Sequence, residues 1–187
     1  MKENDRLITT RQVRFLQRLE DAKGRLMTAI AGLSPEILCS EPVVGTWTVK
    51  DIFGHIVSWD EEFRGSIEMI RQGKHPGYEH QIRGDDDFNG WNQVRISQKR
   101  IWPWERIWRD FERDYWEATE LILDLEPADF RKRGVTPWKQ AAVKRPETLT
   151  KTDTESIETL ITYHWRHSNQ HAGMIERWRK RREKKLS

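Results

Sequence analysis

The sequence contains a single cysteine, Cys39, among its 187 residues. One cysteine excludes a disulfide within the chain and any cysteine-rich zinc cluster, and it fits a reducing compartment. No apolar run approaches the roughly 18 residues that a membrane span needs. The first ten residues also lack the apolar core of a signal peptide. These absences predict a cytoplasmic protein without a membrane partner.

The chain also lacks a strong net charge. Lysine and arginine total 33 against 30 aspartates and glutamates, so the formal charge is only +3, and 34% of all residues are charged. This balance indicates a narrow core with a wide solvated surface. The basic character is local, because seven lysines or arginines lie in residues 177–185. We interpret this basic C-terminal tail, from about residue 177, as a solvated helix end, and nucleic acid is not an expected partner.

Apolar residues recur at spacings of three and four in several long segments, which predicts helices. These segments cover about residues 10–31, 48–70, 104–125 and 154–178. In the second segment Thr48 is the expected N-cap, with Asp51 completing a variant capping box. A shorter helix should begin at Phe88 or Asn89, and Pro103 should mark a kink or a new helix start. We therefore predict an all-α four-helix bundle in a single domain, residues 1–187, with long loops between helices 2 and 3 and between helices 3 and 4.

Histidines occupy positions in two of these segments where a buried helix would normally place leucine. His164, His167 and His171 lie on one seam of the last segment, and His167 and His171 are four residues apart, close enough to share an ion. For that pair alone, core histidines satisfied through hydrogen bonds are the better explanation until a third ligand is found. His55 lies on the apolar stripe of the second segment, so in a bundle it can meet His167 and His171. Three neutral imidazoles leave positions open for water or substrate, as in a catalytic zinc site, and zinc or nickel suits such ligands.

Acidic residues give weaker signals. Glu62 lies on the His55 face and Asp60 is adjacent to the stripe, but both are more often solvated helix residues than general bases, so no catalytic residue is assigned. Asp85, Asp87 and Asn89 imitate the start of a calcium-binding loop. Position twelve of that loop would be Ile96, where a glutamate is needed, so we do not expect calcium binding.

Two stretches carry a family resemblance. Residues 47–59, WTVKDIFGHIVSW, and the HxxxH pair of residues 167–171 resemble the DinB-like (DinB/YfiT) superfamily of four-helix bundles. Residues 87–89 and 104–107 are similar to its ClbS/DfsB branch, and the likeness covers about residues 11–178. The resemblance implies a divalent metal held by His55, His167 and His171. His164 is not one of those three positions, which leaves it as a ligand, an outer partner of the site or a substrate contact.

Three functions follow from the residues and the resemblance. The first is a metal-dependent enzyme that activates water or a thiol, and so acts as a hydrolase or thiol transferase on a small electrophilic substrate. The second is a non-catalytic bundle that binds a small molecule or a metal, or that forms a homodimer through tryptophan-rich faces, since ten tryptophans exceed what one core stripe needs. The third is a metal-independent hydrolase like ClbS. Fold alone does not choose among them.

Overall fold

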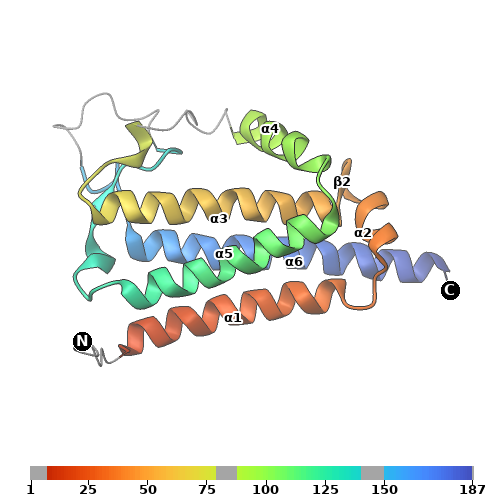
Figure 1. Ribbon diagram of the computed structural model, residues 1–187, viewed down its shortest axis with the longest axis horizontal. Helices are drawn as coiled ribbons and strands as arrows, with labels where there is room; N and C mark the ends of the chain where they lie inside the picture. Colours follow the sequence, from red (N-terminus) through yellow and green to blue (C-terminus); the bar gives the residue numbers. More distant parts are fainter. Residues whose placement is uncertain (1–7, 79–87, 140–149, 187) are drawn as a thin grey trace.

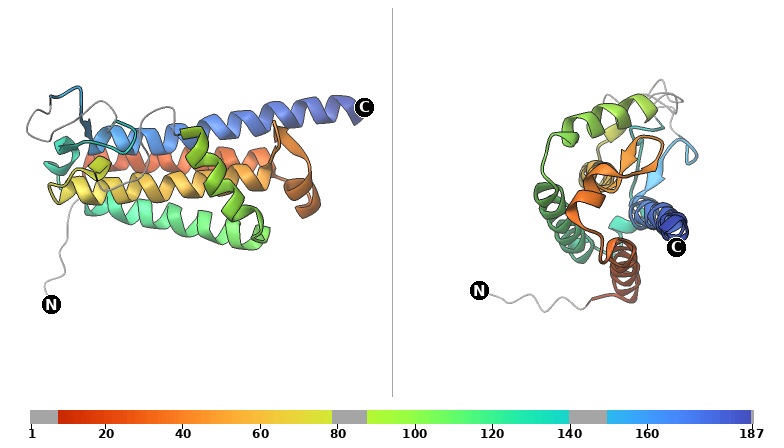
Figure 2. Two further views of the ribbon diagram at one scale, coloured as in Figure 1. Left: turned by 90° about the horizontal axis from the view of Figure 1, so that it is seen from above. Right: turned by 90° about the vertical axis from the view of Figure 1, so that its right-hand side faces the viewer.

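The structure, a computed structural model, describes residues 8–78, 88–139 and 150–186. Four long helices form its body: α1 (Thr10–Ile30), α3 (Val49–Arg71), α5 (Trp104–Asp124) and α6 (Ile157–Leu186). They run side by side in Figure 1. The end-on view of Figure 2 shows α3 between α5 and α6, with α1 completing the ring. The predicted all-α four-helix bundle is confirmed.

Shorter elements occupy the connections between the long helices. They are α2 (Pro35–Ser40), β1 (Pro42–Val44), β2 (Trp47–Thr48), the 3₁₀ turn η1 (Pro76–Tyr78), α4 (Phe88–Arg100), the 3₁₀ turn η3 (Asp129–Arg131), β3 (Arg133–Gly134) and β4 (Glu155–Ser156). The pairs β1–β2 and β3–β4 are antiparallel. Both long connections that the sequence predicts are present, and α4 in the first of them lies across the outer side of α3 (Figure 2).

The helix ends follow the local capping chemistry. Thr48 accepts a hydrogen bond from the backbone of Asp51, whose carboxylate accepts one from the backbone of Thr48, so the predicted capping box is confirmed. The last helix differs from its prediction. Ser156, rather than a residue between 152 and 154, accepts from the backbone N–H of Thr159. The cap moves because residues 155–156 pair with β3 in extended conformation, so α6 begins only at Ile157.

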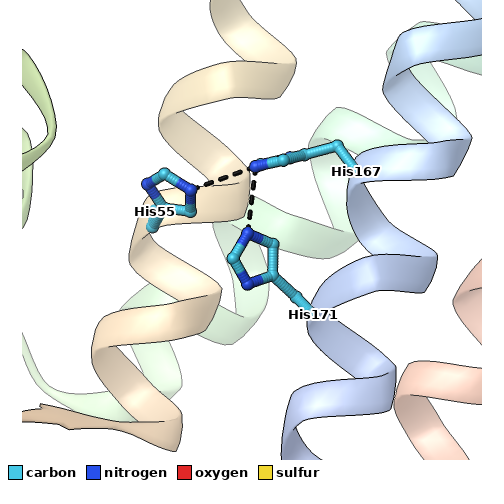
Figure 3. Close-up of side chains that lie close together, drawn as sticks. All are labelled: His55, His167 and His171. Carbon is cyan, nitrogen blue, oxygen red and sulfur yellow. Dashed lines mark hydrogen bonds between the residues drawn. The ribbon is translucent and has the colours of Figure 1, made fainter. Parts of the chain in front are cut away.

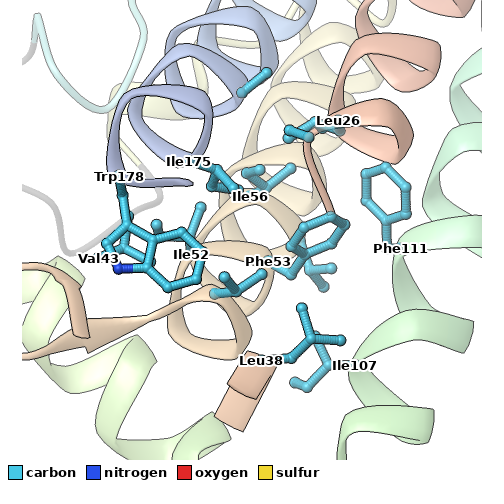
Figure 4. Close-up of a cluster of buried hydrophobic side chains, with 14 residues drawn as sticks. Leu26, Leu38, Val43, Ile52, Phe53, Ile56, Ile107, Phe111, Ile175 and Trp178 are labelled. Carbon is cyan, nitrogen blue, oxygen red and sulfur yellow. The ribbon is translucent and has the colours of Figure 1, made fainter. Parts of the chain in front are cut away.

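Two large apolar clusters fill the described part of the bundle, one towards each end, and a third, smaller cluster contains Trp59 and Phe63. The cluster in Figure 4 joins α3 to the C-terminal half of α6 through residues such as Ile52, Phe53, Ile175 and Trp178. α3 is buried on nearly every side over its first half, because α4 covers the face that a four-helix ring leaves open. A Cβ at Gly54 would lie 3.4 Å from the side chain of Lys99, an ordinary van der Waals distance, so α4 packs directly against this turn of α3. Residues on most sides of the first half of α3 therefore face the interior.

The basic segment after residue 177 continues α6 as helix. Arg182 donates two hydrogen bonds to the carboxylate of Glu41, at 2.8 and 2.9 Å, and Arg179 donates to the carbonyl of Ala31. The segment is thus tied to the end of the bundle at α2 rather than being wholly solvated. None of the described helices has both the length and the apolar character that crossing a bilayer requires.

Candidate metal centre

Three histidines from two helices meet inside the bundle. His55 projects from α3, and His167 and His171 project from adjacent turns of α6 (Figure 3). The Nε2 atom of His167 lies 3.0 Å from Nε2 of His55 and 3.0 Å from Nε2 of His171. The three residues identified from the sequence therefore come together with the same ring nitrogen of each directed at one point.

The donor atoms have the spacing and the protonation state that a divalent ion needs. Zinc binds nitrogen at about 2.0–2.1 Å, so nitrogens on a tetrahedral ion lie about 3.3 Å apart. The two separations from His167 are close to that value, and all three donor atoms lie within 4.8 Å of one another. Burial lowers the pKa of His55 to about 3, with the charges of His171 and Lys99 adding to it, and burial lowers the pKa of His171 to about 4. The pKa of His167 is also well below its usual value, chiefly through burial. Neutral imidazoles with free lone pairs result, so this buried group could hold a metal ion.

The second nitrogen of each ring, Nδ1, has no hydrogen-bond partner among the described residues. All three of these atoms are buried. The ring of Trp47 lies 5.0 Å from that of His55, and Trp59 lies 6.4 Å from His55 and 6.1 Å from His167. Metal-binding histidines usually donate this second N–H to a carboxylate or carbonyl. Here apolar packing, rather than a hydrogen bond to Nδ1, holds the outer side of each ring.

His164 lies on the same seam of α6 but outside this group. Its Nε2 atom is 3.0 Å from Oδ1 of Asp60, which α3 contributes one turn beyond His55. The contact is not a well-aligned hydrogen bond, and neither atom has another hydrogen-bond partner in the described part of the chain. Within the described ranges, the group of residues able to share an ion consists of His55, His167 and His171. His164 therefore faces Asp60 and lies outside the group formed by His55, His167 and His171.

The other candidates from the sequence lie away from the three histidines. Asp60 and Glu62 are buried rather than solvated, Asp60 against His164 and Glu62 within 3.6 Å of Arg95. Neither carboxylate lines the pocket described below, nor does Cys39, which is half-buried on α2. Asp85 and Asp87, of the calcium-loop imitation, lie outside the described residues.

A pocket of about 930 Å³ opens over the histidines, all three of which line it. Its walls are largely aromatic: Trp47, Trp59, Phe63, Phe88, Trp138 and Tyr163. Two wall residues close around Trp59, with the ring of Phe88 at 5.6 Å and that of Trp138 at 5.9 Å. The pocket is large enough for a drug-sized molecule. The arrangement offers an ion site at the base of an aromatic pocket.

One feature of the pocket escaped the sequence analysis. Asn89, Asn92 and Gln93 line it from α4, and Asn92 accepts a hydrogen bond from the indole N–H of Trp59 at 2.9 Å. Their spacing of three and four along a predicted helix would have placed three side-chain amides on one face. The sequence could have shown that these amides share a helix face, but it did not indicate that this face lines the pocket.

The comparisons with known proteins agree with this fold. The family model of the DinB superfamily matches residues 18–175, whereas no curated protein sequence matches the chain. A solved structure from Streptococcus pneumoniae is similar, with a TM-score of 0.71, 11% identity, and coverage of 94% of this chain and 93% of that one.

Two further solved structures are similar over most of their lengths. An uncharacterised protein from Clostridium difficile 630 has a TM-score of 0.71 at 10% identity, over 93% of this chain and 98% of the other. An uncharacterised protein from Escherichia coli UTI89 has a TM-score of 0.67 at 13% identity, over 92% and 94%. At such identities the likeness establishes the fold alone.

Proposed function

The chain belongs to the DinB superfamily, and from that premise we propose that it is a metal-dependent enzyme acting on a small electrophilic molecule. One observation carries the proposal: three neutral imidazoles, two of them buried and that of His167 half-buried, direct their Nε2 atoms at one point and line a 930 Å³ pocket. A closed structural site would normally have four protein ligands. Three ligands beside a pocket leave room for an exchangeable one.

His55, His167 and His171 would hold the ion, and zinc or nickel suits their imidazole nitrogens. Such an ion lowers the pKa of a coordinated water or thiol and so supplies a nucleophile near neutral pH. The reaction is then hydrolysis or thiol transfer. No aspartate or glutamate lines the pocket among the described residues, so among these residues the ion, rather than a carboxylate, would activate the nucleophile. The aromatic walls would hold the substrate over the ion and exclude water from its apolar parts.

Elemental analysis of the purified protein, prepared without an affinity tag, tests the proposal. We expect about one equivalent of zinc or nickel per chain, and its loss when His55, His167 and His171 are all replaced by alanine. Circular dichroism checks that this variant remains helical. Binding of metal at full stoichiometry by the variant, or no binding by the natural chain even after reconstitution, would overturn the assignment.

A non-catalytic binding protein is the second candidate, and the size and aromatic lining of the pocket favour it. It predicts that molecules bind without turnover when the metal-loaded protein is screened with thiol acceptors and hydrolysable substrates. The metal content then separates a binding protein that uses the ion from one that uses the pocket alone.

A further inference from the structure

The polar groups that line the pocket, as well as its shape, restrict which molecules it can bind. We infer that it takes a flat, uncharged molecule whose hydrogen-bond acceptor is bound by the side-chain amide of Asn92. The inference deepens the proposed function and rests on it only where it equates the bound molecule with the substrate. It concerns the body of that molecule, outside the atom that would meet the ion.

Flatness follows from the aromatic walls. The ring of Trp59 lies 6.1 Å from that of His167, and Phe63 and Trp138 meet edge to face at 5.6 Å on the same side of the pocket. Aromatic surfaces interact best with other planar groups, by offset stacking or edge contacts. A planar conjugated or aromatic body therefore gains more from these walls than a branched aliphatic one does.

The absence of charge follows from what the walls lack. Among the described residues that line the pocket, none is lysine, arginine, aspartate or glutamate. Beyond the reach of an ion at the histidines, a carboxylate or phosphate on the ligand would find no counter-ion among these described lining residues, and its lost hydration is costly in a partly enclosed apolar site.

Among the described residues, Glu155 and Lys99 are charged groups near the pocket that already have partners. Glu155 accepts from the indole N–H of Trp138 at 3.2 Å and from the hydroxyl of Tyr163 at 2.9 Å, and Lys139 lies 3.5 Å away. On α4, Lys99 donates to Ser58 at 2.6 Å. Glu155 thus holds two wall residues in place from behind and is not offered to a ligand.

Asn92 supplies the polar contact, and its orientation is fixed. The indole N–H of Trp59 only donates, so the atom it meets at 2.9 Å must be the amide oxygen of Asn92. The amide nitrogen, Nδ2, then points to the other side and has no hydrogen-bond partner in the residues that the structure describes. Because Asn92 lines the pocket, its two N–H groups remain for an acceptor on the ligand. The indole of Trp59, which holds this amide, also lies 6.4 Å from the ring of His55 and 6.1 Å from that of His167. The acceptor would therefore be separated from the ion site by the side chain of Trp59.

The test compares probes of one shape and different charge. Cobalt-loaded protein is titrated with 4-mercaptobenzamide, 4-mercaptobenzoate and thiophenol, and the cobalt–thiolate absorbance band reports binding. We expect the amide to bind at least about tenfold more tightly than the carboxylate, because only the carboxylate carries an unpaired charge into the pocket. Equal or tighter binding of the carboxylate would overturn the inference.

Two variants isolate the amide of Asn92. Asn92→Leu removes both of its polar atoms, whereas Asn92→Asp keeps an oxygen for Trp59, removes the donor and adds a negative charge. Both should reduce the preference for 4-mercaptobenzamide over thiophenol about fivefold to tenfold, the effect of one lost hydrogen bond. Gln98→Leu, on an exposed position of α4 outside the pocket, should leave the preference unchanged. An unchanged preference in both Asn92 variants contradicts the assigned role.

A separate arm keeps this inference distinct from the metal proposal. If cobalt does not bind, the proposed function fails, and the charge preference is then measured on metal-free protein. Saturation-transfer NMR with benzamide and benzoate gives that comparison directly. Preference for benzamide in the metal-free protein supports the pocket inference without the metal, and no preference overturns it.

Discussion

Histidines on the same seam of α6 have opposite surroundings at two sites. At one, His167 and His171 meet His55 beneath a 930 Å³ pocket, and no carboxylate supports their rings in the described structure. At the other, one turn earlier, His164 faces Asp60 beside a cavity of only about 10 Å³. Such a cavity holds about one water molecule. The helix therefore supplies equivalent positions, and the residue opposite on α3 decides whether an imidazole is left for an ion or paired with an acid.

The acid at the closed site belongs to a larger buried cluster. Asp114 on α5 is fully buried and lies 3.3 Å from Arg64. Burial raises the pKa of Asp114 to about 7, with Asp60 and Glu61 adding to the rise and Arg64 opposing it. The site of His164 and Asp60, called the closed site, thus lies among buried ionisable groups. The site of His55, His167 and His171, called the open site, contains only neutral rings. Buried charge pairs affect stability, whereas neutral rings beside a pocket are available to a ligand.

The largest expected effect comes from breaking the closed site. His164→Ala leaves Asp60 buried without its facing partner, and removal of one member of a buried pair typically costs about 3 kcal/mol or more. We expect the free energy of unfolding, measured with urea, to fall by about that amount. The double variant Asp60→Asn, His164→Gln removes the charge together with the imidazole and should recover part of the loss. A loss below about 1 kcal/mol in His164→Ala would show that the pair contributes little to stability.

The second prediction tests the division of roles between the two sites. His167→Ala removes one of the three nitrogen ligands at the open site and should weaken zinc binding more than about 100-fold. That loss exceeds the usual effect of changing a residue that only supports a ligand. His164→Gln keeps a donor for Asp60 and should alter zinc affinity less than about threefold. Competition with a chelator of known affinity measures both. Comparable losses in the two variants would mean that His164 also belongs to the ion site.

The third prediction concerns pH and has the smallest effect. The pKa of Asp114 is higher in the folded chain than in the unfolded chain, so between about pH 4 and 7 the folded state holds more protons. The stability contributed by its protonation is present at low pH and is lost as pH rises through about 7. One pKa unit corresponds to about 1.4 kcal/mol, so the loss from pH 5 to pH 7 is on the order of 2 kcal/mol for this residue.

Asp114→Asn should remove this part of the pH dependence, because the amide does not titrate. Urea unfolding of both proteins at pH 5, 6, 7 and 8 gives the comparison. The variant should gain stability relative to the natural chain as pH increases. A constant difference across that range would show that Asp114 titrates below it, and hence that Arg64 outweighs burial.

The sequence predicts most of the fold because its signals are local. The caps and apolar spacing locate α1, α3 and α5 closely, and Pro103 does separate α4 from α5. The start of α6 was misplaced because Ser156 caps it only once residues 155–156 pair with β3, a strand more than twenty residues away in sequence. Local patterns do not record such a pairing.

Some residues of the candidate site could be predicted from the sequence, and the contacts of others could not. His55, His167 and His171 follow from helical spacing together with the family resemblance, and the structure brings them together, although metal binding itself stays a prediction. The partners of His164 and Asn92 could not be read from the chain. Asp60 and His164 are 104 positions apart, and Trp59 and Asn92 are 33 apart.

The amino-acid sequence by itself determined the helical class, the main caps and the seam of histidines on the last helix, because each depends on residues within a few turns of one another. Tertiary structure alone decided which of those histidines meet His55 and which meets Asp60, since that depends on the register between α3 and α6. It also decided that α4 lies across α3 with the amide of Asn92 against Trp59. Packing between distant segments fixes both, and with them the chemistry of the pocket.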